Sequence, residues 1–573
     1  MNIFEIYLIE ISSIIKKNKK KLNLKSLNNF KGMTVENPPP NFDCDLSTNV
    51  SLILAKLNKL NPKQLSENIK YLLLKNIKDF EDVNSEGPGF INIRLSNKAI
   101  YSIINNIIRK KDTYGSQKNK NSYNIEFVSA NPTGPMHIGH CRGAIFGDVL
   151  SNLLKFNGNK VTKEYYINDY GSQIKNFVKS VFLRIREIKY QEKFIDQKDL
   201  YPGEYIKDIA KEILIKNKSS FNSFENNYNF LEKMSLKYSM ASIKKDLEKL
   251  GIKHDIFISE KSIVKANTVT KAINQLKKTN HVEDGYLDPP KGEEIKNWKK
   301  TKRLIFKSTL FKDDTNRALK KDDNSWTYFA NDVGYHHTKI IRRYDYLVNI
   351  LGADHTGYIK RISAAVNALS KNKIKLICKV CQLVKFIKNG QPFKMSKREG
   401  DFITIKDVLN EVGKDSVRFM MLNRGNEVEI DFDFDKVLEK SKDNPVFYVQ
   451  YSYARINSLF RSLNFNLNNN INFKNKDYLP NPYEIKLLRK IIEWPKIIEL
   501  ASNKLEPHRI PFYLYELSTI FHSYWSRGNE NPKYKFIVNG KINNPLSLKI
   551  FQLIAIILQN GMSILGVSLP KKM

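Results

Sequence analysis

The sequence predicts an α/β fold: a parallel sheet interrupted by an inserted segment, with an α+β domain before it and an all-helical domain after it. Three observations support this prediction. A buried strand leads directly into a helix near residue 125, strand patterns return after a charged helical stretch, and the chain becomes helical beyond residue 444. At 573 residues the chain is longer than one hydrophobic core usually supports. We therefore expect three domains, at residues 1–112, 113–443 and 444–573.

The N-terminal domain begins with a helical pattern and ends in a strand pattern. Apolar residues recur at helical spacing in Ile3, Phe4, Tyr7, Leu8, Ile11 and Ile14. Alternation in residues 89–95 places Ile91 and Ile93 toward the core and Phe90 and Asn92 on the opposite face. An exposed ring beside an amide can stack on a splayed nucleic-acid base and read its edge. Alternatively, Phe90 belongs to a second core face and Asn92 to a turn.

The middle of the chain alternates between strands and helices. Residues 124–140 predict a buried strand, a turn rich in Pro and Gly, and a helix that begins at His137-Ile-Gly-His140. That helix repeats apolar residues before Gly158 at Ile145, Phe146, Val149, Leu150, Leu153 and Leu154. Further strands are expected near residues 161–166, 303–306, 346–351 and 374–387, and the charged helical stretch 180–300 looks like an insertion. Such interrupted alternation predicts a Rossmann-like sheet split by an inserted domain.

The turn from strand to helix at His137 and His140 is suited to binding phosphate. A helix N-terminus presents backbone N–H groups and the positive end of its dipole, and two imidazoles can donate further hydrogen bonds. Gly139 leaves room for a flat group against the backbone. The plainer interpretation is a pair of ordinary helix-capping histidines.

A second motif, Lys394-Met395-Ser396-Lys397 followed by Arg398, also suggests phosphate chemistry. It comes just after a hairpin signal at Asn389-Gly390. Two lysines three residues apart can both reach a triphosphate and neutralise the charge on a departing pyrophosphate. In so lysine-rich a chain, a solvated run of charge is the alternative.

Composition is consistent with this chemistry but does not specify it. A net charge of +36 indicates either a polyanionic partner or a genome that favours lysine codons. Four cysteines do not make a disulfide framework, and we interpret the Cys378 and Cys381 pair as structural rather than as a zinc site. No signal peptide is evident, and the apolar run at residues 550–558 is too short to span a bilayer. These features predict a soluble protein of a reducing compartment.

The two motifs resemble the signatures of class I aminoacyl-tRNA synthetases, and longer stretches resemble bacterial arginyl-tRNA synthetases over nearly the whole chain. The longest stretch is Glu126-Phe-Val-Ser-Ala-Asn-Pro-Thr-Gly-Pro, which continues to His140. Others are Tyr166-Ile-Asn-Asp169, Gly352-Ala-Asp-His355, Asp443-Asn-Pro-Val-Phe-Tyr-Val-Gln-Tyr451, Glu506-Pro-His-Arg509, Asp45-Leu-Ser-Thr-Asn49 and Gly87-Pro-Gly-Phe-Ile-Asn92.

The resemblance implies ATP-dependent attachment of L-arginine to tRNA(Arg) through an arginyl-adenylate, for translation. It implies ATP with Mg²⁺ as substrate, no tightly bound cofactor and no protein-held metal. The partners would be tRNA(Arg), L-arginine and ATP, without a membrane, and we expect a cytoplasmic monomer. The residues it assigns to catalysis are His137, His140, Lys394 and Lys397, and those it assigns to ATP binding add Pro132, Gly139, Met395 and Ser396.

The resemblance also assigns the arginine site and the tRNA contacts. Glu260, Tyr328 and Asp332 match guanidinium partners, whereas Glu126 and Asn131 match residues that hold the substrate's ammonium, its carboxylate or the nearby ribose. A planar guanidinium is best held by fixed carboxylates, which agrees with that assignment. The alternative for both Glu260 and Asp332 is a surface carboxylate or a helix cap, and Asp332 does precede a helical pattern.

Where some family members carry a glutamine beside the substrate, this chain has Asp354 and His355. Phe90 and Asn92 match an aromatic-x-Asn that contacts a tRNA D-loop base, so residues 1–112 would bind the D-loop. The helical domain at 444–573 would bind the anticodon.

Two competing hypotheses remain at this point. One is a different class I synthetase, such as the cysteinyl or glutamyl enzyme. The other is a non-catalytic RNA-binding descendant of a synthetase, although the intact His137, His140, Lys394 and Lys397 argue against it.

Overall fold

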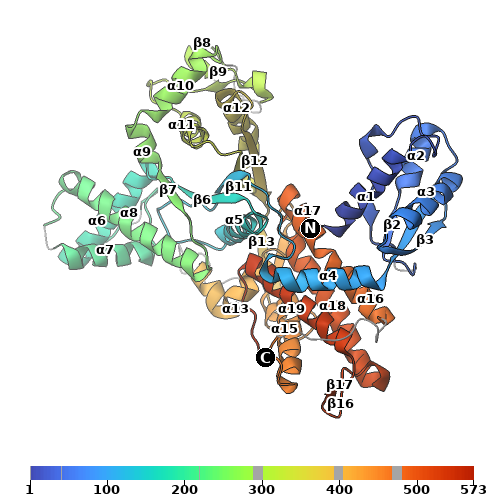
Figure 1. Cartoon of the computed structure of the whole chain (residues 1–573). Helices are drawn as coiled ribbons and strands as arrows, with labels where there is room; N and C mark the ends of the chain where they lie inside the picture. Colours follow the sequence, from blue (N-terminus) through green and yellow to red (C-terminus); the bar gives the residue numbers. More distant parts are fainter. Residues whose placement is uncertain are drawn as a thin grey trace. The chain divides into compact units, whose positions relative to one another are not determined.

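The computed structural model describes residues 2–39, 42–195, 197–217, 220–287, 301–392, 404–467 and 480–573. The chain forms two compact units (Figure 1). One unit combines residues 1–118 with residues 440–573, and the other contains residues 119–439.

A five-stranded parallel sheet forms the centre of the 119–439 unit, with strand order β12-β11-β5-β6-β7. The strands are β5 (Ser122–Glu126), β6 (Lys160–Ile167), β7 (Ile256–Ser259), β11 (Tyr346–Gly352) and β12 (Lys375–Cys381). The chain builds outward from β5 to β7 and then returns to place β11 on the other side of β5. The strand order therefore reverses between β5 and β11. In doubly wound sheets, ligands bind at the carboxyl ends of the strands beside such a reversal. The predicted Rossmann-like sheet is confirmed.

Helices complete the parallel connections of this sheet. Helix α5 (Gly139–Phe156) links β5 to β6, α11 (Tyr328–Ile341) precedes β11, and α12 (Ile359–Ser370) links β11 to β12. The apolar face predicted for α5 is buried throughout. Gly147 allows α5 to approach the chain just after β5, because an added Cβ would lie 2.3 Å from the Phe127 ring.

The charged stretch after β6 is helical at first. Helices α6 (Ser172–Tyr190), α7 (Glu204–Lys216) and α8 (Phe224–Lys249) share a core of their own. The stretch is not helical to residue 300, because Ile256–Ser259 returns to the central sheet as edge strand β7. Strand β7 was missed because the charged stretch around it was interpreted as helical throughout. Helices α9 (Glu260–Lys265) and α10 (Thr268–Lys278) follow it.

Two expected strands join other sheets. Strand β9 (Arg303–Phe306) pairs antiparallel with β8 (Val282–Gly285) and β10 (Arg317–Ala318), so it lies outside the central sheet. The single strand expected at 374–387 is two strands, β12 and β13 (Val384–Lys388). The hairpin predicted at Asn389-Gly390 is present: both residues have positive φ, at 53° and 69°, and β13 pairs with β14 (Gln391–Pro392). Helix α13 (Ile405–Met420), strand β15 (Ile430–Asp433) and helix α14 (Phe434–Leu438) end the unit.

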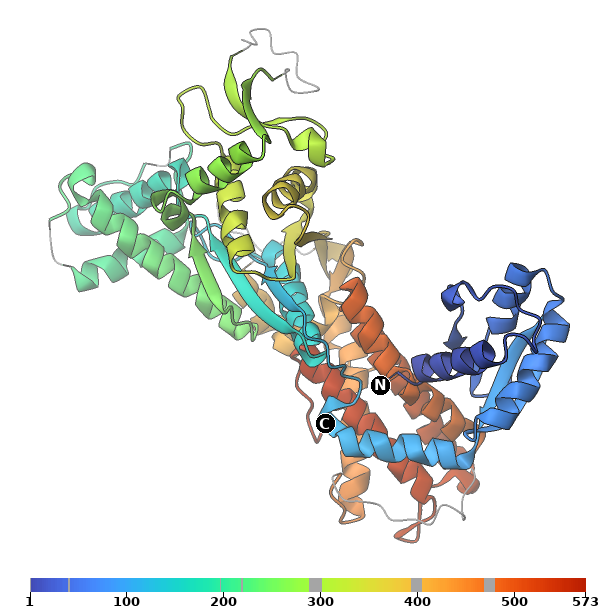
Figure 2. The same ribbon diagram turned by 45° about the horizontal axis from the view of Figure 1, so that its top comes forward.

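The N-terminal part of the other unit is an α+β domain, as expected. Its antiparallel sheet has the order β1-β2-β4-β3, formed by Val35–Glu36, Leu46–Thr48, Phe90–Leu95 and Phe80–Glu86. Helices α1 (Ile3–Lys17), α2 (Val50–Asn58) and α3 (Pro62–Asn76) cover one side of the sheet. Ile91 and Ile93 are fully buried, which confirms the face predicted for them. Helix α4 (Asn97–Lys110) then packs on α19, as both ribbon views show (Figures 1 and 2).

The C-terminal part of this unit is helical, which confirms the third element of the fold class. It contains α15 (Pro445–Ser462), α16 (Pro482–Ile492), α17 (Trp494–Lys504), α18 (Arg509–Glu530) and α19 (Pro545–Leu565), with a short hairpin of Ile537–Val538 and Lys541–Ile542. By length and composition α19 could cross a membrane, but 83% of its most apolar window is buried inside the protein. That burial is what the central helix of a folded bundle shows.

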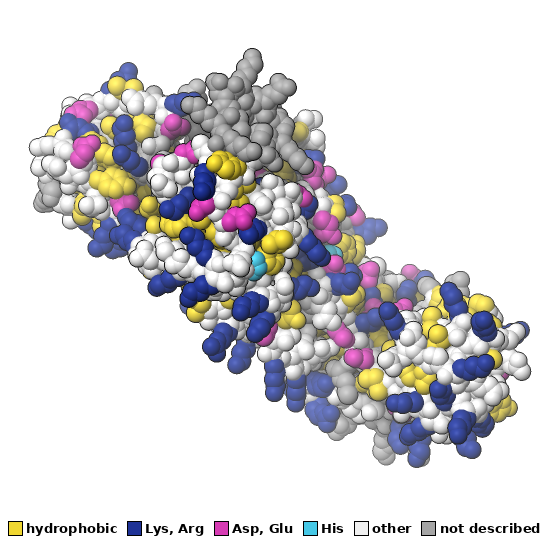
Figure 3. All heavy atoms as spheres, turned by 90° about the horizontal axis from the view of Figure 1, so that it is seen from above, with side chains coloured by type: hydrophobic (Ala, Val, Ile, Leu, Met, Phe, Trp, Pro, Cys, Tyr) yellow, Lys and Arg dark blue, Asp and Glu magenta, His cyan; other side chains and the backbone are white. Residues whose placement is uncertain are grey.

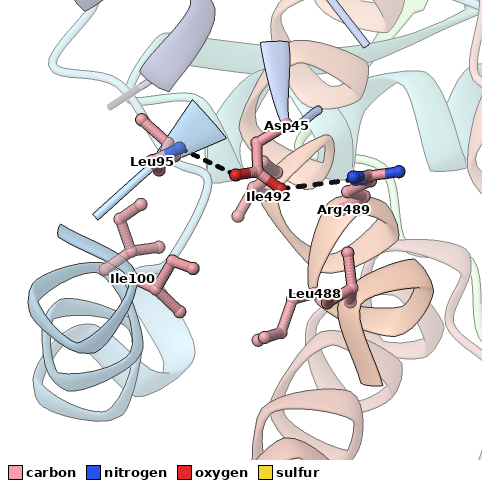
Figure 4. A pocket seen from close by; sticks show the side chains of 8 residues that line it. Asp45, Leu95, Ile100, Leu488, Arg489 and Ile492 are labelled. Atoms are coloured by element: carbon pink, nitrogen blue, oxygen red, sulfur yellow. Dashed lines mark hydrogen bonds and ion pairs between the residues drawn. The ribbon is translucent and has the colours of Figure 1, made fainter. Parts of the chain in front are cut away.

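The two parts of this unit meet around an ion pair (Figure 4). Asp45 accepts a hydrogen bond from the backbone N–H of Leu95 at 2.8 Å and faces the Nε of Arg489, on α16, at 3.4 Å. Apolar side chains line the small pocket beside the pair, among them Ile100 and Ile492. The N-terminal sheet is thereby attached to the helices through charge as well as apolar contact.

Basic side chains are spread over the visible surface of both units, and fewer acidic side chains are interspersed among these basic ones (Figure 3). This distribution matches the formal net charge of +36. It agrees with either cause considered for the charge, a polyanionic partner or lysine-rich codon usage.

Candidate active site

The two histidines lie where β5 passes into α5, at the reversal of strand order. Their ring centroids are 3.8 Å apart, and the backbone N–H of Gly139 donates to Nδ1 of His137 at 3.1 Å. A Cβ at Gly139 would lie 2.9 Å from the His137 ring, so glycine is required for this close approach. The turn before them is strained, because Val128 and Ser129 have φ of 70° and 43°.

Burial keeps both imidazoles neutral near pH 7. It lowers the pKa of His137, and burial together with the neighbouring His137 lowers the pKa of His140 to about 4. Within the described part of the chain, Nδ1 of His140 is buried without a hydrogen-bond partner. A buried polar atom without a partner at a helix N-terminus indicates a site for a ligand.

The second motif, Lys394-Met395-Ser396-Lys397, lies outside the described residues. The chain that follows it lies at the histidine turn. Thr404 forms an antiparallel bridge with His137, and the N–H of Ile405 donates to the carbonyl of Met136 at 3.3 Å.

Four carboxylates act on the hydroxyl of Tyr166, on strand β6, and three of them belong to residues assigned to the arginine site. Glu126 ends β5, Glu260 begins α9, and Asp332 lies in the second turn of α11. Burial raises the pKa of the Tyr166 hydroxyl, and the charges of Asp332, Glu260 and Glu126 raise it further. Side chains distant in sequence thus form one acidic cluster at the carboxyl edge of the sheet, which we call the acidic pocket.

Glu260 is a buried acid and not a surface residue. Its side chain is only 3% exposed, accepts from Nδ2 of Asn331 at 3.0 Å and is hydrogen-bonded by Tyr166. Burial raises its pKa. The residue that caps α9 is Ser259. Because Glu260 is buried and is not the cap, both the surface and the capping interpretations of Glu260 are wrong.

Asp332 is not a helix cap. Thr327 caps α11, whereas Asp332 lies inside the helix and accepts a hydrogen bond from the Tyr358 hydroxyl. Burial and the charges of Glu260 and Glu126 raise its pKa to about 7, although the Tyr358 hydrogen bond and Lys339 oppose the shift. A carboxyl group whose pKa is raised in this way by neighbouring acids favours a cationic ligand, because the cation would balance the negative charge of the pocket.

Comparisons with known proteins agree along the whole chain. Residues 103–461 match the model for the catalytic domain of class I tRNA synthetases (R), residues 10–95 match the arginyl tRNA synthetase N terminal domain, and residues 449–573 match the DALR anticodon binding domain. An arginine–tRNA ligase of Pelagibacter ubique is 54% identical over 100% of both chains, and one of Bartonella bacilliformis is 42% identical over 100% of both. The chain belongs to the arginyl-tRNA synthetase family.

Solved structures agree with this membership. A putative arginyl-tRNA synthetase of Campylobacter jejuni superposes with a TM-score of 0.73 at 31% identity, over 84% of this chain and 100% of that one. The Thermus thermophilus arginyl-tRNA synthetase, at 17% identity, shares the fold with a TM-score of 0.68 over 97% and 100% of the two chains. Membership of this family of ATP-using class I enzymes excludes the cysteinyl and glutamyl alternatives.

The remaining residues assigned to the arginine site differ in exposure. Tyr328 begins α11 one turn before Asp332 and is 62% exposed, so it borders the pocket and is not packed within it. Asn131 is exposed and accepts from Asn168 at 3.1 Å. Pro132 is buried in the turn before the histidines. Asp354 and His355 are exposed and lie 3.4 Å apart, and the charge of Asp354 acts on His140, not on the acidic pocket.

Sequence reasoning missed three residues of the synthetase's acidic pocket, Tyr166, Lys339 and Tyr358. Lys339 is fully buried on α11, and its ammonium lies 2.5 Å from Glu126 Oε2 and 3.2 Å from Asn349 Oδ1. Lys339 follows Asp332 by seven residues, a spacing that places both on one face of a helix. That spacing was a usable signal. Tyr166 begins a stretch that matches the family, but no role was assigned to it, and Tyr358, in the β11–α12 connection, left no signal.

Phe90 and Asn92 lie on the side of the N-terminal sheet opposite its core. Phe90 is 42% exposed, and Asn92 is 6% exposed within strand β4, so Asn92 is not a turn residue. Asn92 pairs across the sheet with Asn84 and lines a hollow of about 70 Å³. The other lining residues are Phe42, Asp43, Cys44, Asp82, Glu86 and Arg94.

Proposed function

We propose that this chain joins L-arginine to tRNA(Arg) in two ATP-dependent steps, through an arginyl-adenylate. The observation that supports this most directly is the acidic pocket beside the histidine turn, at the reversal of strand order. A cationic side chain in that pocket brings its own carboxylate toward a phosphate bound at the N-terminus of α5. The reaction needs those two groups to meet.

In the first step the arginine carboxylate attacks the α-phosphate of ATP, and pyrophosphate leaves. No protein nucleophile is required, so the protein contributes position and charge. His137 and His140 would bind ATP together with Pro132 and Gly139. Lys394 and Lys397 would neutralise the pyrophosphate, and Met395 and Ser396 would contribute to ATP binding, as the resemblance implies.

Mg²⁺ would accompany ATP rather than occupy a protein cage. Among the described residues no group of three His, Cys, Asp or Glu side chains could hold a metal ion. Mg²⁺ commonly binds the phosphates of its nucleotide and keeps several waters, so it would not need a cage of protein ligands.

The guanidinium of the substrate would lie between Asp332 and Glu260, with Tyr328 at the mouth of the pocket. A planar guanidinium can satisfy two carboxylates with its five donors, whereas an ammonium presents a single point of charge. Glu126 and Asn131, nearer to the end of β5, would hold the α-ammonium, the carboxylate or the ribose of the nucleotide.

In the second step the terminal ribose hydroxyl of the tRNA attacks the activated carbonyl. The N-terminal domain would contact the D-loop through Phe90 and Asn92. The helical domain would contact the anticodon loop, where Arg455 lies 4.9 Å from the rings of both Tyr451 and Trp525. Cationic and aromatic groups of this kind stack on splayed bases. We expect the enzyme to act as a cytoplasmic monomer without a membrane.

Aminoacylation of unfractionated tRNA with each labelled amino acid tests the proposal. Arginine alone should be attached, and exchange of pyrophosphate into ATP should depend on arginine when tRNA is present. Attachment of another amino acid, or tRNA binding without any attachment, would refute it. The second result would favour the non-catalytic RNA-binding protein.

A further inference from the structure

We propose that Tyr358 is a positioning residue that fixes the Asp332 carboxylate for a planar cationic side chain and so sets the discrimination between arginine and its neutral analogue citrulline. The inference rests on the proposed function, because it assumes that arginine occupies the acidic pocket. Tyr358 ends the short turn Ala353–Tyr358 that connects β11 to α12.

The contact joins two elements that border the pocket from different sides. The Tyr358 hydroxyl donates to Oδ2 of Asp332, which is anchored on α11. Within the described part of the chain, no other side chain donates to that carboxylate. The other oxygen of Asp332 therefore stays available to a ligand, while one oxygen is held in place. Tyr166 acts on Glu260 in the same way from β6.

A tyrosine donor has a consequence that a packing contact would not have. It stabilises the ionised carboxylate and not the protonated one. The groups that face Asp332 are Glu260 on α9, Glu126 at the end of β5, Tyr166 on β6, Lys339 on α11 and Tyr358 itself. Burial and the two acids favour the protonated form, whereas Lys339 and Tyr358 oppose it.

The state of Asp332 decides which side chain the pocket accepts. Ionised Asp332 attracts a guanidinium and repels the oxygen of a ureido group. Protonated Asp332 loses the attraction and can donate to that oxygen. Loss of the Tyr358 hydroxyl should therefore weaken arginine binding at neutral pH and leave citrulline binding unchanged or tighter.

The experiment compares Tyr358→Phe with the wild type in arginine-dependent pyrophosphate exchange with tRNA, from pH 6 to 9, with citrulline as a competitor. The variant should lose on the order of tenfold in kcat/KM for arginine at pH 7, the effect of a hydrogen bond to a charged group. The acid limb of the pH profile of kcat/KM for arginine should move to higher pH, and activity should recover toward pH 9. The ratio of the citrulline inhibition constant to the arginine KM should fall, which would show reduced discrimination between the two amino acids.

Tyr335→Phe is the matched control. Its hydroxyl, on α11, also donates to a buried carboxylate, that of Glu164 at 2.8 Å, which Arg342 binds as well and which is not a proposed substrate contact. Its ring packs on Tyr166, and the phenylalanine keeps that ring contact. This variant should melt earlier without moving the acid limb or the citrulline ratio. If Tyr358→Phe behaves like Tyr335→Phe, or loses activity equally at every pH, the inference is overturned.

Two further measurements separate the possible failures. 3,5-Difluorotyrosine at position 358 keeps the ring and strengthens the donor, so the acid limb should move to lower pH even if Tyr358→Phe does not fold. A limb that stays in place would overturn the inference. Absence of arginine-dependent exchange in the wild type would instead refute the proposed function, and this inference with it.

Discussion

At the scale of single residues, the ionisation state of Asp332 determines how well the acidic pocket can bind a cation. Burial and the neighbouring charges of Glu260 and Glu126 raise its pKa to about 7. In the proposed site, arginine would stay positively charged across the working range of an enzyme and would bind the ionised carboxylate. The proton on Asp332 would then have to leave for arginine to bind.

The resulting prediction is a pH-dependent arginine affinity. Below about pH 7 the KM for arginine should rise, approaching tenfold per pH unit, and above it the KM should level off. ATP affinity should not follow the same curve. Steady-state exchange at fixed ATP measures both, and Asp332→Asn is the control, because it should raise the arginine KM at every pH and abolish this limb. Loss of a charge-assisted hydrogen bond is worth ~1.5–3 kcal/mol. An Asp332→Asn protein that keeps its arginine affinity and only melts earlier would show that Asp332 is structural.

A second residue-scale prediction concerns the two signature motifs. His140→Ala and Lys397→Ala should each reduce adenylate formation by roughly 100-fold or more, since a donor to developing phosphate charge is typically worth ~3 kcal/mol. Binding of tRNA should change little. Rapid-quench measurement of adenylate beside a filter-binding assay distinguishes the two effects. Near-normal turnover in both variants would contradict the assignment.

At this scale, sequence reasoning named Glu260 and Asp332 through the family resemblance but did not name their partners. The burial of Glu260 decides against a surface carboxylate, and Thr327, which caps α11, decides against a cap at Asp332. Tyr358 and Lys339 act through contacts made only after folding. No local pattern marks a tyrosine that will face an aspartate 26 residues earlier in the chain.

At the scale of elements, α5 is held by a buried network of charges. Asp148 on α5 accepts from Lys163 on β6 at 2.6 Å and from Arg418 on α13 at 2.5 Å. Two residues after His140, buried Arg142 donates to the carbonyls of Gln382, Gly425 and Val428. The helix that presents the histidines is thereby fixed to the strands and to α13.

We predict that Asp148→Asn destabilises the protein by about 3–5 kcal/mol, because it leaves two buried cations without their counter-charge. Denaturant unfolding measures the change. Glu429→Gln is the comparison, since Glu429 and Lys385 form an exposed pair that solvent screens, so its loss should change stability far less. Equal effects of the two substitutions would show that the buried network contributes no more than a surface ion pair.

The long elements were predictable because their patterns are periodic, and the short ones were not. The apolar repeat of α5 and the Asn389-Gly390 hairpin follow from local rules. Strand β7 has four residues, and the strand expected at 374–387 divides between two sheets. Which strands pair is decided by long-range packing, so no local pattern reveals it.

At the scale of the whole molecule, the regions expected to contact the body of the tRNA belong to one compact unit. Residues 1–118 and 440–573 form that unit, whereas the catalytic sheet belongs to the other. Within it, the Asp45–Arg489 pair attaches the N-terminal sheet to α16 (Figure 4). Changes to the N-terminal sheet should therefore alter the use of tRNA without altering the binding of the small substrates.

Asn92 offers the sharpest test of this separation. Asn92 lines a hollow on the strand face that it shares with Phe90, away from Ile91 and Ile93, and it could hydrogen-bond a base that stacks on the ring. Asn92→Ala should reduce kcat/KM for tRNA by about 1–2 kcal/mol, the size of a lost hydrogen bond, while the KM values for arginine and ATP stay constant. The loss should shrink when the D-loop base is itself changed, because the contact is then already absent. Aminoacylation of wild-type and D-loop-altered tRNA by both proteins completes this cycle. An equal loss with both tRNAs would show that Asn92 supports the sheet and does not read the base.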